Sequence, residues 1–395
     1  IPYSCRFNDA GNSYMTRTIA SDGNRKTWTL SFWCKRSHMK GETSQNGYVL
    51  FGGAADGARI MFHEDQGGDT FTVTQGGVFI APAVNLRDPS AWYHFVVVLD
   101  TTQGTASDRC KIWINGVQQT SFAPAANYPG LNETLNWNRT GHEFGIGRTS
   151  QYSTRVYDGY LAEVHWVDGT ALDETSFGEF DTDYGHWKPK KYSGSHGTNG
   201  FHLDFKNSGS LGNDAAGSNN FTVQSVATTD QVADSPTNNF CTLNSLNKHS
   251  SVVLSEGSLQ LLTNGLNQAV NSTMAIPSSG KFYWEVYAKT VVGTSVNVGL
   301  VSAEQLGSTY NVGYVQNWNS YQHPDNRVYL AYGTKAGSIA GASTSAYGAS
   351  WTSGDIIGVA VDMDAPSLTF YKNNATQGVS HTDLAPTATQ LQQHW

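Results

Sequence analysis

The chain has few charged residues and no long apolar run. Of its 395 residues, 14% are charged, and the formal net charge is -8 with a pI near 5.8. A nucleic-acid-binding protein needs a basic stripe to neutralise phosphates, so this balance argues against nucleic acid as a partner. No stretch approaches the ~18 consecutive apolar residues that a membrane helix requires, so we expect no membrane insertion.

Sustained helical periodicity is missing as well. Glycine accounts for 41 residues and aromatic side chains for 12%, a mixture that favours strands and turns. Cys5 and Cys241 match no metal-binding spacing, whereas Cys34 and Cys110 lie on the apolar faces of predicted strands and act there as small core residues. A disulfide between Cys34 and Cys110 would require these two strands to touch. We therefore expect an all-β protein.

Two pairs of segments predict antiparallel hairpins. Residues 354–362 and 368–374 alternate apolar and polar side chains, as strands from the core of a sandwich do. A related pair occupies residues 92–100 and 110–116 and ends in the Asn-Gly signal of a tight hairpin turn. Because one hydrophobic core rarely serves more than roughly 250 to 300 residues, the length favours two domains. We predict two β-sandwiches of jelly-roll type in series.

Five segments of the first half share a recognisable pattern, namely 28–33, 92–94, 111–116, 145–147 and 158–163. Through them, residues 1–190 resemble a laminin-G-like domain of the concanavalin A-like jelly-roll class. The form with residues 167–172 and 176–179 resembles versions found in structural proteins of tailed bacteriophages.

Residues 191–245 form a polar passage rich in Gly, Asn and Ser with short apolar anchors, which predicts an irregular connector. Residues 246–395 resemble a SPRY domain, through segments 280–286 and 298–301 and the hairpin near the end of the chain. SPRY domains normally continue through further strands after this hairpin. We therefore expect a second sandwich that lacks its last strands.

The bacteriophage resemblance implies a non-enzymatic structural protein located in the virion. We expect a tail fibre or tail-associated adhesin that recognises a host-surface glycan or protein, contacts other virion proteins and forms a homo-oligomer. A capsid decoration or head-fibre protein, a secreted carbohydrate-binding lectin and a polysaccharide depolymerase are the alternatives. A depolymerase needs two facing carboxylates; Glu179 and Asp181 come nearest, but they follow the last clear strand of the domain.

Aromatic and amide side chains interleave in residues 316–327, a polar segment of the SPRY-like part. Sugars stack on aromatic rings and exchange hydrogen bonds with amides and carboxylates, so this composition is typical of a recognition loop. The predicted ligand-binding residues are Trp318, Tyr321, His323 and Arg327, together with Trp137 in the first domain. The alternative is that each tryptophan packs its own loop against the sandwich.

Acidic residues at strand ends are the predicted metal ligands. Laminin-G-like domains sometimes bind calcium at such positions, so the resemblance implies a calcium site that involves Asp158 and Asp168. Aspartate is also common in turns, where its side chain forms local hydrogen bonds, and this remains the alternative for both residues. We expect no other cofactor.

Overall fold

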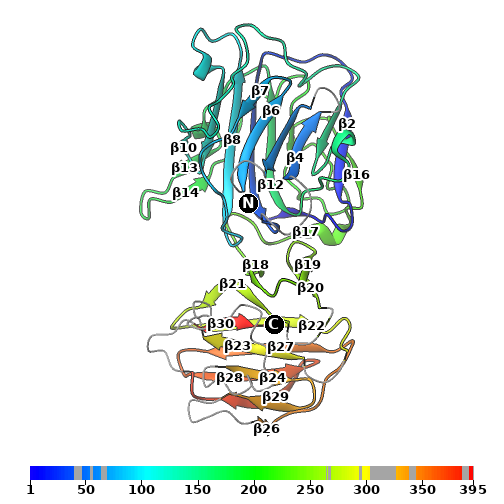
Figure 1. Ribbon diagram of the computed structural model, residues 1–395, viewed down its shortest axis with the longest axis vertical. Helices are drawn as coiled ribbons and strands as arrows, with labels where there is room; N and C mark the ends of the chain where they lie inside the picture. Colours follow the sequence, from blue (N-terminus) through cyan, green and yellow to red (C-terminus); the bar gives the residue numbers. More distant parts are fainter. Residues whose placement is uncertain are drawn as a thin grey trace. The chain divides into compact units, whose positions relative to one another are not determined.

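The computed structural model consists of β-strands joined by loops and three-residue 3₁₀ helices (Figure 1). It describes residues 1–39, 47–53, 57–63, 69–263, 265, 268–292, 296–302, 326–337, 344–384 and 391–394. The chain divides into two units, the first with residues 1–240 and 255–260, the second with residues 241–254 and 261–395. The 3₁₀ helices are η1 (Ala106–Asp108), η2 (Ser150–Tyr152), η3 (Glu174–Ser176) and η4 (Thr228–Asp230).

The first unit contains two antiparallel sheets and a ribbon. In spatial order, the eight-stranded sheet consists of β10 (Val117–Gln118), β9 (Cys110–Ile114), β8 (Trp92–Asp100), β3 (Thr27–Arg36), β12 (Gly159–Asp168), β1 (Ser4–Phe7) and β17 (Gln231–Val232), with β15 (Phe201–Leu203) also paired to β12. The seven-stranded sheet consists of β16 (Thr222–Gln224), β2 (Tyr14–Thr18), β11 (Glu143–Ile146), β4 (Gly47–Gly53), β5 (Arg59–His63), β6 (Thr70–Gln75) and β7 (Val78–Ile80). The ribbon pairs β13 (Gly178–Phe180) with β14 (Trp187–Pro189).

Phenylalanine rings from both sheets meet at the centre of this unit. Phe95 on β8 stacks on Phe32 of β3 with ring centroids 5.2 Å apart, and on Phe71 of β6 at 4.3 Å. Alternate residues of a strand face the same side, so each of these strands contributes one apolar face to the shared core. Cys34 and Cys110 lie in the same core, and all four cysteines, which fall in the described ranges, are free thiols. The predicted β-sandwich is confirmed.

The segment predicted as a connector packs onto this unit. It supplies β15, β16 and β17 to the two sheets, so the first unit extends to residue 240. Lys35 Nζ, on a side chain that is 1% exposed, lies 2.9 Å from Asp234 Oδ2, and Trp92 Nε1 donates to Asp234 Oδ1 at 2.9 Å. A buried charge requires a partner, so this ion pair fixes the polar segment to β3 and β8.

The second unit is also a sandwich of two antiparallel sheets. The seven-stranded sheet runs β18 (Leu243–Lys248), β21 (Val270–Ile276), β30 (Leu391–His394), β23 (Asn297–Ser302), β24 (Arg327–Leu330), β25 (Thr334–Ala336) and β26 (Thr344–Ala346). The four-stranded sheet runs β22 (Lys281–Tyr287), β27 (Ile356–Asp362), β28 (Ser367–Lys372) and β29 (Ala375–His381). A short pair, β19 (Val253–Ser255) and β20 (Gln260–Leu262), completes the strands.

Both hairpins predicted from the alternation of side chains are present. β8 pairs with β9, and the Asn115-Gly116 turn that follows has φ angles of 49° and 77°, as a tight primed turn requires. β27 pairs with β28, and Asn373-Asn374 closes the next turn with φ angles of 48° and 66°. Strands β29 and β30 follow this hairpin, contrary to the expectation that the last strands are missing. No helix in the described ranges has the length and apolar character needed to cross a membrane.

Candidate functional site

A β-bulge interrupts β12 on the outer face of the eight-stranded sheet. Leu161, Val164 and Trp166 all belong to the core, so the alternation of side chains is broken at Glu163. The ladder with β3 shifts register here, and Glu163 has a φ of 46°, a conformation that costs an L-residue roughly 1–2 kcal/mol. A bulge adds one residue and re-aims a side chain. In this strand it turns Glu163 away from the core, toward the face that carries His165.

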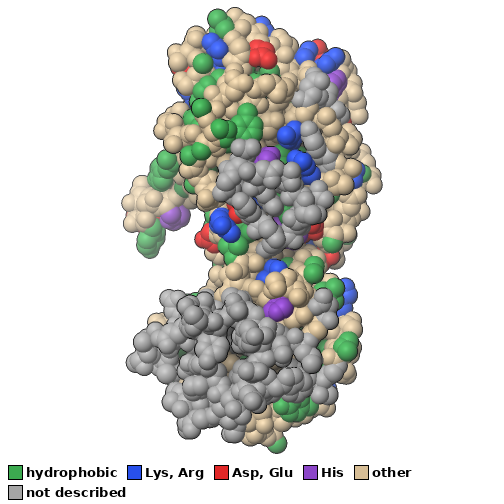
Figure 2. All heavy atoms as spheres, in the orientation of Figure 1, with side chains coloured by type: hydrophobic (Ala, Val, Ile, Leu, Met, Phe, Trp, Pro, Cys, Tyr) green, Lys and Arg blue, Asp and Glu red, His purple; other side chains and the backbone are tan. Residues whose placement is uncertain are grey.

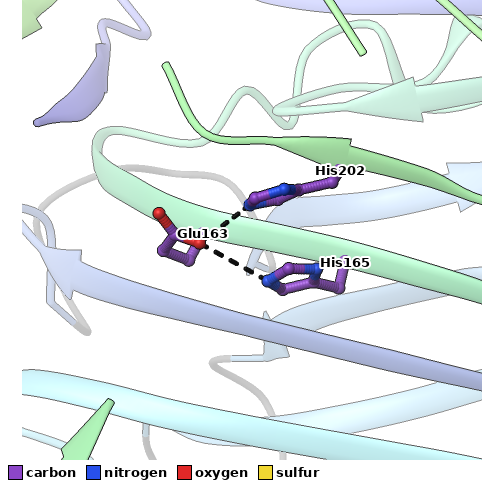
Figure 3. Close-up of side chains that lie close together, drawn as sticks. All are labelled: Glu163, His165 and His202. Carbon is purple, nitrogen blue, oxygen red and sulfur yellow. Dashed lines mark hydrogen bonds and ion pairs between the residues drawn. The ribbon is translucent and has the colours of Figure 1, made fainter. Parts of the chain in front are cut away.

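Glu163 lies between two imidazoles (Figure 3). Its Oε2 is 2.8 Å from His202 Nε2 and 3.5 Å from His165 Nε2. His202 on β15 is directly opposite His165 in the ladder, and the two rings stack with centroids 3.9 Å apart. A third imidazole extends the group, because His196 Nε2 lies 3.1 Å from His165 Nδ1. We call Glu163, His165 and His202 the His–Glu cluster.

The surroundings favour a neutral imidazole at His165 and an ionised carboxylate at Glu163. Burial lowers the pKa of His165 to about 4, so its ring is uncharged at pH 7. Burial also lowers the pKa of His196. For Glu163, burial opposes ionisation, but hydrogen bonds with His165 and His202 hold its pKa well below the usual range. Imidazole nitrogen with carboxylate oxygen is a donor set that suits divalent transition metals.

A second polar cluster lies at the start of β12. Asp9, His38 and Asp158 each offer a ligand atom within 4.8 Å of the others. Asp158 is 2% exposed, and its Oδ1 accepts no hydrogen bond from the described residues. Burial raises the pKa of Asp158 to about 7, whereas the pKa of Asp9 is lowered, because its interaction with His38 outweighs its own burial. At mildly acidic pH, Asp158 is therefore protonated while Asp9 is ionised.

The four-stranded sheet of the second unit carries a shallow groove on its outer face. The groove has a volume of about 340 Å³, and Tyr283 of β22 and Tyr371 of β28 stand over it. Their rings meet edge to face with centroids 6.3 Å apart, and Tyr283 is 55% exposed. Ala360 and Thr369, directly opposite each other in the ladder, form a floor of small side chains.

Charged and hydroxyl groups line one end of this groove. Lys281 Nζ lies 2.6 Å from Asp362 Oδ2, and Ser367 is the ladder partner of Asp362. Gly358 completes the arrangement, because a Cβ at this position would collide with the hydroxyl of Tyr283. Only glycine therefore allows the Tyr283 ring to lie over β27.

Comparison with protein families identifies both units. Residues 9–175 match the model of the Concanavalin A-like lectin/glucanases superfamily, and residues 281–391 match the model of the SPRY domain. The chain carries one domain of each kind. We call them the lectin-like domain and the SPRY domain, and we call the first unit of the chain, which contains the former, the lectin-like unit. No curated protein matches the chain.

Several solved structures have chains that are similar to parts of this one. The SPRY domain of human HERC1 is 22% identical, with 38% of this chain and 87% of that chain covered and a TM-score of 0.31. A putative carbohydrate binding protein from Bacteroides ovatus is 15% identical, with 57% and 60% covered and a TM-score of 0.34. A heptameric SAP-like pentraxin from Limulus polyphemus is 14% identical, with 40% and 71% covered and a TM-score of 0.30. At these values the similarities carry no inference about ligands.

The two aspartates predicted as calcium ligands lie at opposite ends of β12. A strand of 10 residues separates Asp158 from Asp168 by about 30 Å, so they cannot bind the same ion. Asp168 Oδ1 accepts hydrogen bonds from Asn24 N at 2.7 Å and Asn138 Nδ2 at 2.9 Å, while its Oδ2 accepts one from Asn199 N at 3.0 Å. Asp168 therefore holds three loops together. This agrees with the alternative interpretation, in which its side chain forms hydrogen bonds in turns instead of binding calcium. Calcium at Asp158 stays a prediction.

Trp137 lies in the core of the lectin-like unit. Its side chain is 2% exposed, and its ring centroid is 5.7 Å from those of both Trp28 and Trp166. A ring enclosed by other aromatic rings has no face left for a sugar. The structure thus corresponds to the alternative in which Trp137 packs its loop against the sandwich.

The four other predicted ligand-binding residues belong to the SPRY domain. Trp318, Tyr321 and His323 lie outside the described residues. Arg327 is 3% exposed and makes a bidentate contact with Asp383, with Nε donating to Oδ1 at 2.9 Å and Nη2 to Oδ2 at 3.0 Å. Such paired hydrogen bonds are strong and directional, so Arg327 in this conformation binds its own chain.

The carboxylates of the depolymerase alternative lie on the β13–β14 ribbon. Lys188 Nζ contacts both of them, at 3.5 Å from Glu179 and 3.2 Å from Asp181. Backbone hydrogen bonds from Tyr184 and Asp183, with the contact to Lys188, lower the pKa of Asp181 to about 2. The general acid of a glycosidase needs a raised pKa, whereas the pKa of Asp181 is lowered, so Asp181 does not suit that role.

A buried serine–histidine pair was not anticipated from the sequence. Ser31 Oγ lies 2.9 Å from His94 Nε2, which is the geometry of a nucleophile and its base. Trp187 Nε1, however, donates to His94 Nδ1 at 2.9 Å, so the imidazole proton sits on Nε2 and is donated to Ser31. A general base needs the other tautomer. Burial also lowers the pKa of His94 to about 3, and the pair is structural.

The turn of the ribbon exposes aromatic side chains. Tyr184 is 85% exposed and Phe180 is 51% exposed. Figure 2 shows hydrophobic and histidine side chains together where this ribbon projects from the lectin-like unit. Local composition draws attention to the acids of this stretch, whereas the structure shows that its aromatic rings are exposed, as is typical of contact surfaces.

Proposed function

We propose that the protein is a non-enzymatic carbohydrate-binding protein and that the groove of the SPRY domain is a glycan site. The observation that carries this proposal is the pair Tyr283 and Tyr371 above a floor of small residues, with charged and hydroxyl groups at one end. The apolar faces of sugar rings stack on aromatic side chains, and their hydroxyls exchange hydrogen bonds with such polar groups. The lectin-like domain supports the same class of ligand, because its family model is that of lectins and glucanases.

The size of the groove suits a short saccharide. Its volume of about 340 Å³ lies at the lower end of the range of roughly 300–1,000 Å³ that is usual for ligand sites. The side chain of Lys281 is 72% exposed, so its ammonium group is accessible to the hydroxyls of a ligand. We expect one or two sugar residues to bind, with further residues of a longer glycan extending into solvent.

Binding without hydrolysis is supported by the acids and histidines of the lectin-like unit. Glu179 and Asp181 share the positive charge of Lys188, and His94 has the tautomer that donates to Ser31. The lowered pKa of Asp181 does not suit a general acid, and His94 in this tautomer does not suit a general base.

The test is a glycan array probed with the full chain, followed by calorimetry with the best ligand. Tyr371→Ala should weaken binding at least tenfold, about 1.4 kcal/mol, because it removes a stacking face. Tyr287→Ala is the matched control: this tyrosine is 62% exposed on the same sheet and does not line the groove. Unchanged affinity of Tyr371→Ala would show that the glycan binds elsewhere, and an array without any bound glycan would contradict the function.

We further propose that this binding serves a tailed-phage particle, in a tail fibre or tail-associated adhesin that contacts host-surface glycans. The resemblance of residues 1–190 to structural proteins of such phages supports the setting. Capsid decoration is the second candidate, supported by the exposed ribbon turn with Tyr184, which can contact a neighbouring virion protein or another copy of this chain. Antibodies against the chain, viewed on intact particles by electron microscopy, separate these roles: label at the tail supports adhesion, label over the capsid supports decoration, and unlabelled particles contradict both.

A further inference from the structure

We propose that Glu163, His165 and His202 bind a divalent metal ion of the zinc type, which fastens the short strand β15 to β12. The proposal concerns the lectin-like unit and does not depend on the glycan site. The three side chains come from two neighbouring strands and converge on the outer face of the sheet (Figure 3).

The spacing of the donor atoms suits a small metal ion. Zinc binds imidazole nitrogen and carboxylate oxygen at about 2.0–2.2 Å, so in a tetrahedral site these atoms lie roughly 3.3 Å apart. The contacts of Glu163 Oε2 with His202 Nε2 and His165 Nε2, at 2.8 Å and 3.5 Å, lie on either side of this value. All three donor atoms lie within 4.8 Å of one another. A small shift of Oε2, together with rotation of the stacked imidazoles, would allow all three to bind one ion.

The donor set and its surroundings also match a zinc site. Two histidines and one glutamate form a common zinc-binding set, in which a water or an external ligand takes the fourth position. A ligating histidine usually donates its other ring N–H to a neighbour, which fixes the tautomer. His196 provides this neighbour, because its Nε2 lies 3.1 Å from His165 Nδ1.

The local fold explains what such an ion would do. Strand β15 has three residues and pairs only with β12 among the described strands, while the bulge that presents Glu163 is itself a costly conformation. An ion held by both strands joins them where backbone pairing is short. The side chains of Glu163 and His202 are 21% and 19% exposed, so an ion can reach them from solvent.

The experiment is a titration of the full chain with zinc chloride after treatment with a chelator, followed by equilibrium dialysis and elemental analysis. We expect one ion per chain at this cluster. Glu163→Gln, which preserves the shape of the side chain, and His202→Ala should each weaken zinc binding by about 100-fold, and His196→Gln by about tenfold. His186→Ala is the control, because this histidine is exposed on the ribbon and is not one of the residues of the cluster; it should bind zinc as the wild type does.

Two further measurements distinguish a specific metal site from non-specific binding of zinc to the protein surface. Cobalt in place of zinc should give the visible absorption of a tetrahedral ion in the wild type and lose it in Glu163→Gln. Zinc should raise the thermal midpoint of the wild type but not of Glu163→Gln, since a ligand specific to the native state stabilises it. Absence of zinc binding by the wild type overturns the proposal. The proposal is also overturned if Glu163→Gln and His202→Ala keep the zinc affinity of the wild type while Asp158→Asn reduces it. That result would place the ion in the Asp9–His38–Asp158 cluster.

Discussion

Replacing Trp137 by alanine separates the two roles that the sequence allows for this residue. Its ring is 2% exposed, and its centroid lies 5.7 Å from Trp28, 5.7 Å from Trp166 and 5.8 Å from Phe144. Truncation of a buried tryptophan removes this packing and leaves a cavity, at a cost of about 3–5 kcal/mol. In a unit of this size each kcal/mol lowers the melting temperature by about 2–4 °C, so we expect a drop on the order of 10 °C.

Thermal unfolding followed by circular dichroism measures this effect, with glycan affinity measured on the same samples below the transition. Tyr184→Ala is the matched control, because its ring is 85% exposed in the same unit and its removal should change stability by less than about 0.5 kcal/mol. An unchanged melting temperature of Trp137→Ala, together with a loss of glycan binding, would refute the core assignment and restore Trp137 as a ligand-binding residue.

Three further substitutions test a buried carboxyl group, a buried ion pair and the groove. The pKa of Asp158 is about 7 in the folded state against 3.8 for a free carboxyl group, so between these pH values the folded chain binds a proton that the unfolded chain has released. Denaturant titrations should therefore show the unfolding free energy falling as the pH rises from about 4 to 7, and Asp158→Asn should flatten that slope. Asp234→Ala removes the negative charge that faces the buried Lys35 and should lower the unfolding free energy by about 3–5 kcal/mol; an unchanged denaturation midpoint would contradict the importance of this ion pair. Gly358→Ala should displace Tyr283 and weaken glycan binding with little change in melting temperature.

The strands and turns of this protein follow from local sequence. Alternation of apolar and polar side chains marks β8 and β27, because a strand presents successive residues to opposite faces. The Asn115-Gly116 turn is equally local, since both residues adopt positive φ at low cost. The two-sandwich fold was therefore predictable, and so was its resemblance to lectin-like and SPRY domains.

The His–Glu cluster and the groove, by contrast, are formed by segments that lie far apart in the sequence. Glu163 and His202 are separated by 39 positions and meet only because β15 pairs with β12, while a bulge turns Glu163 out of the core. The groove likewise needs Tyr283 and Tyr371 on strands that both pair with β27.

The same reasoning explains the surroundings of Trp137 and Asp168. Polar neighbours and strand-end positions make them candidate binding residues in the sequence, yet Trp137 is enclosed by aromatic rings and Asp168 accepts hydrogen bonds from three loops. Local composition determines which residues form strands and turns. Ladder register and the packing of one sheet on another decide which side chains meet, because these depend on pairing between segments that are far apart in the chain.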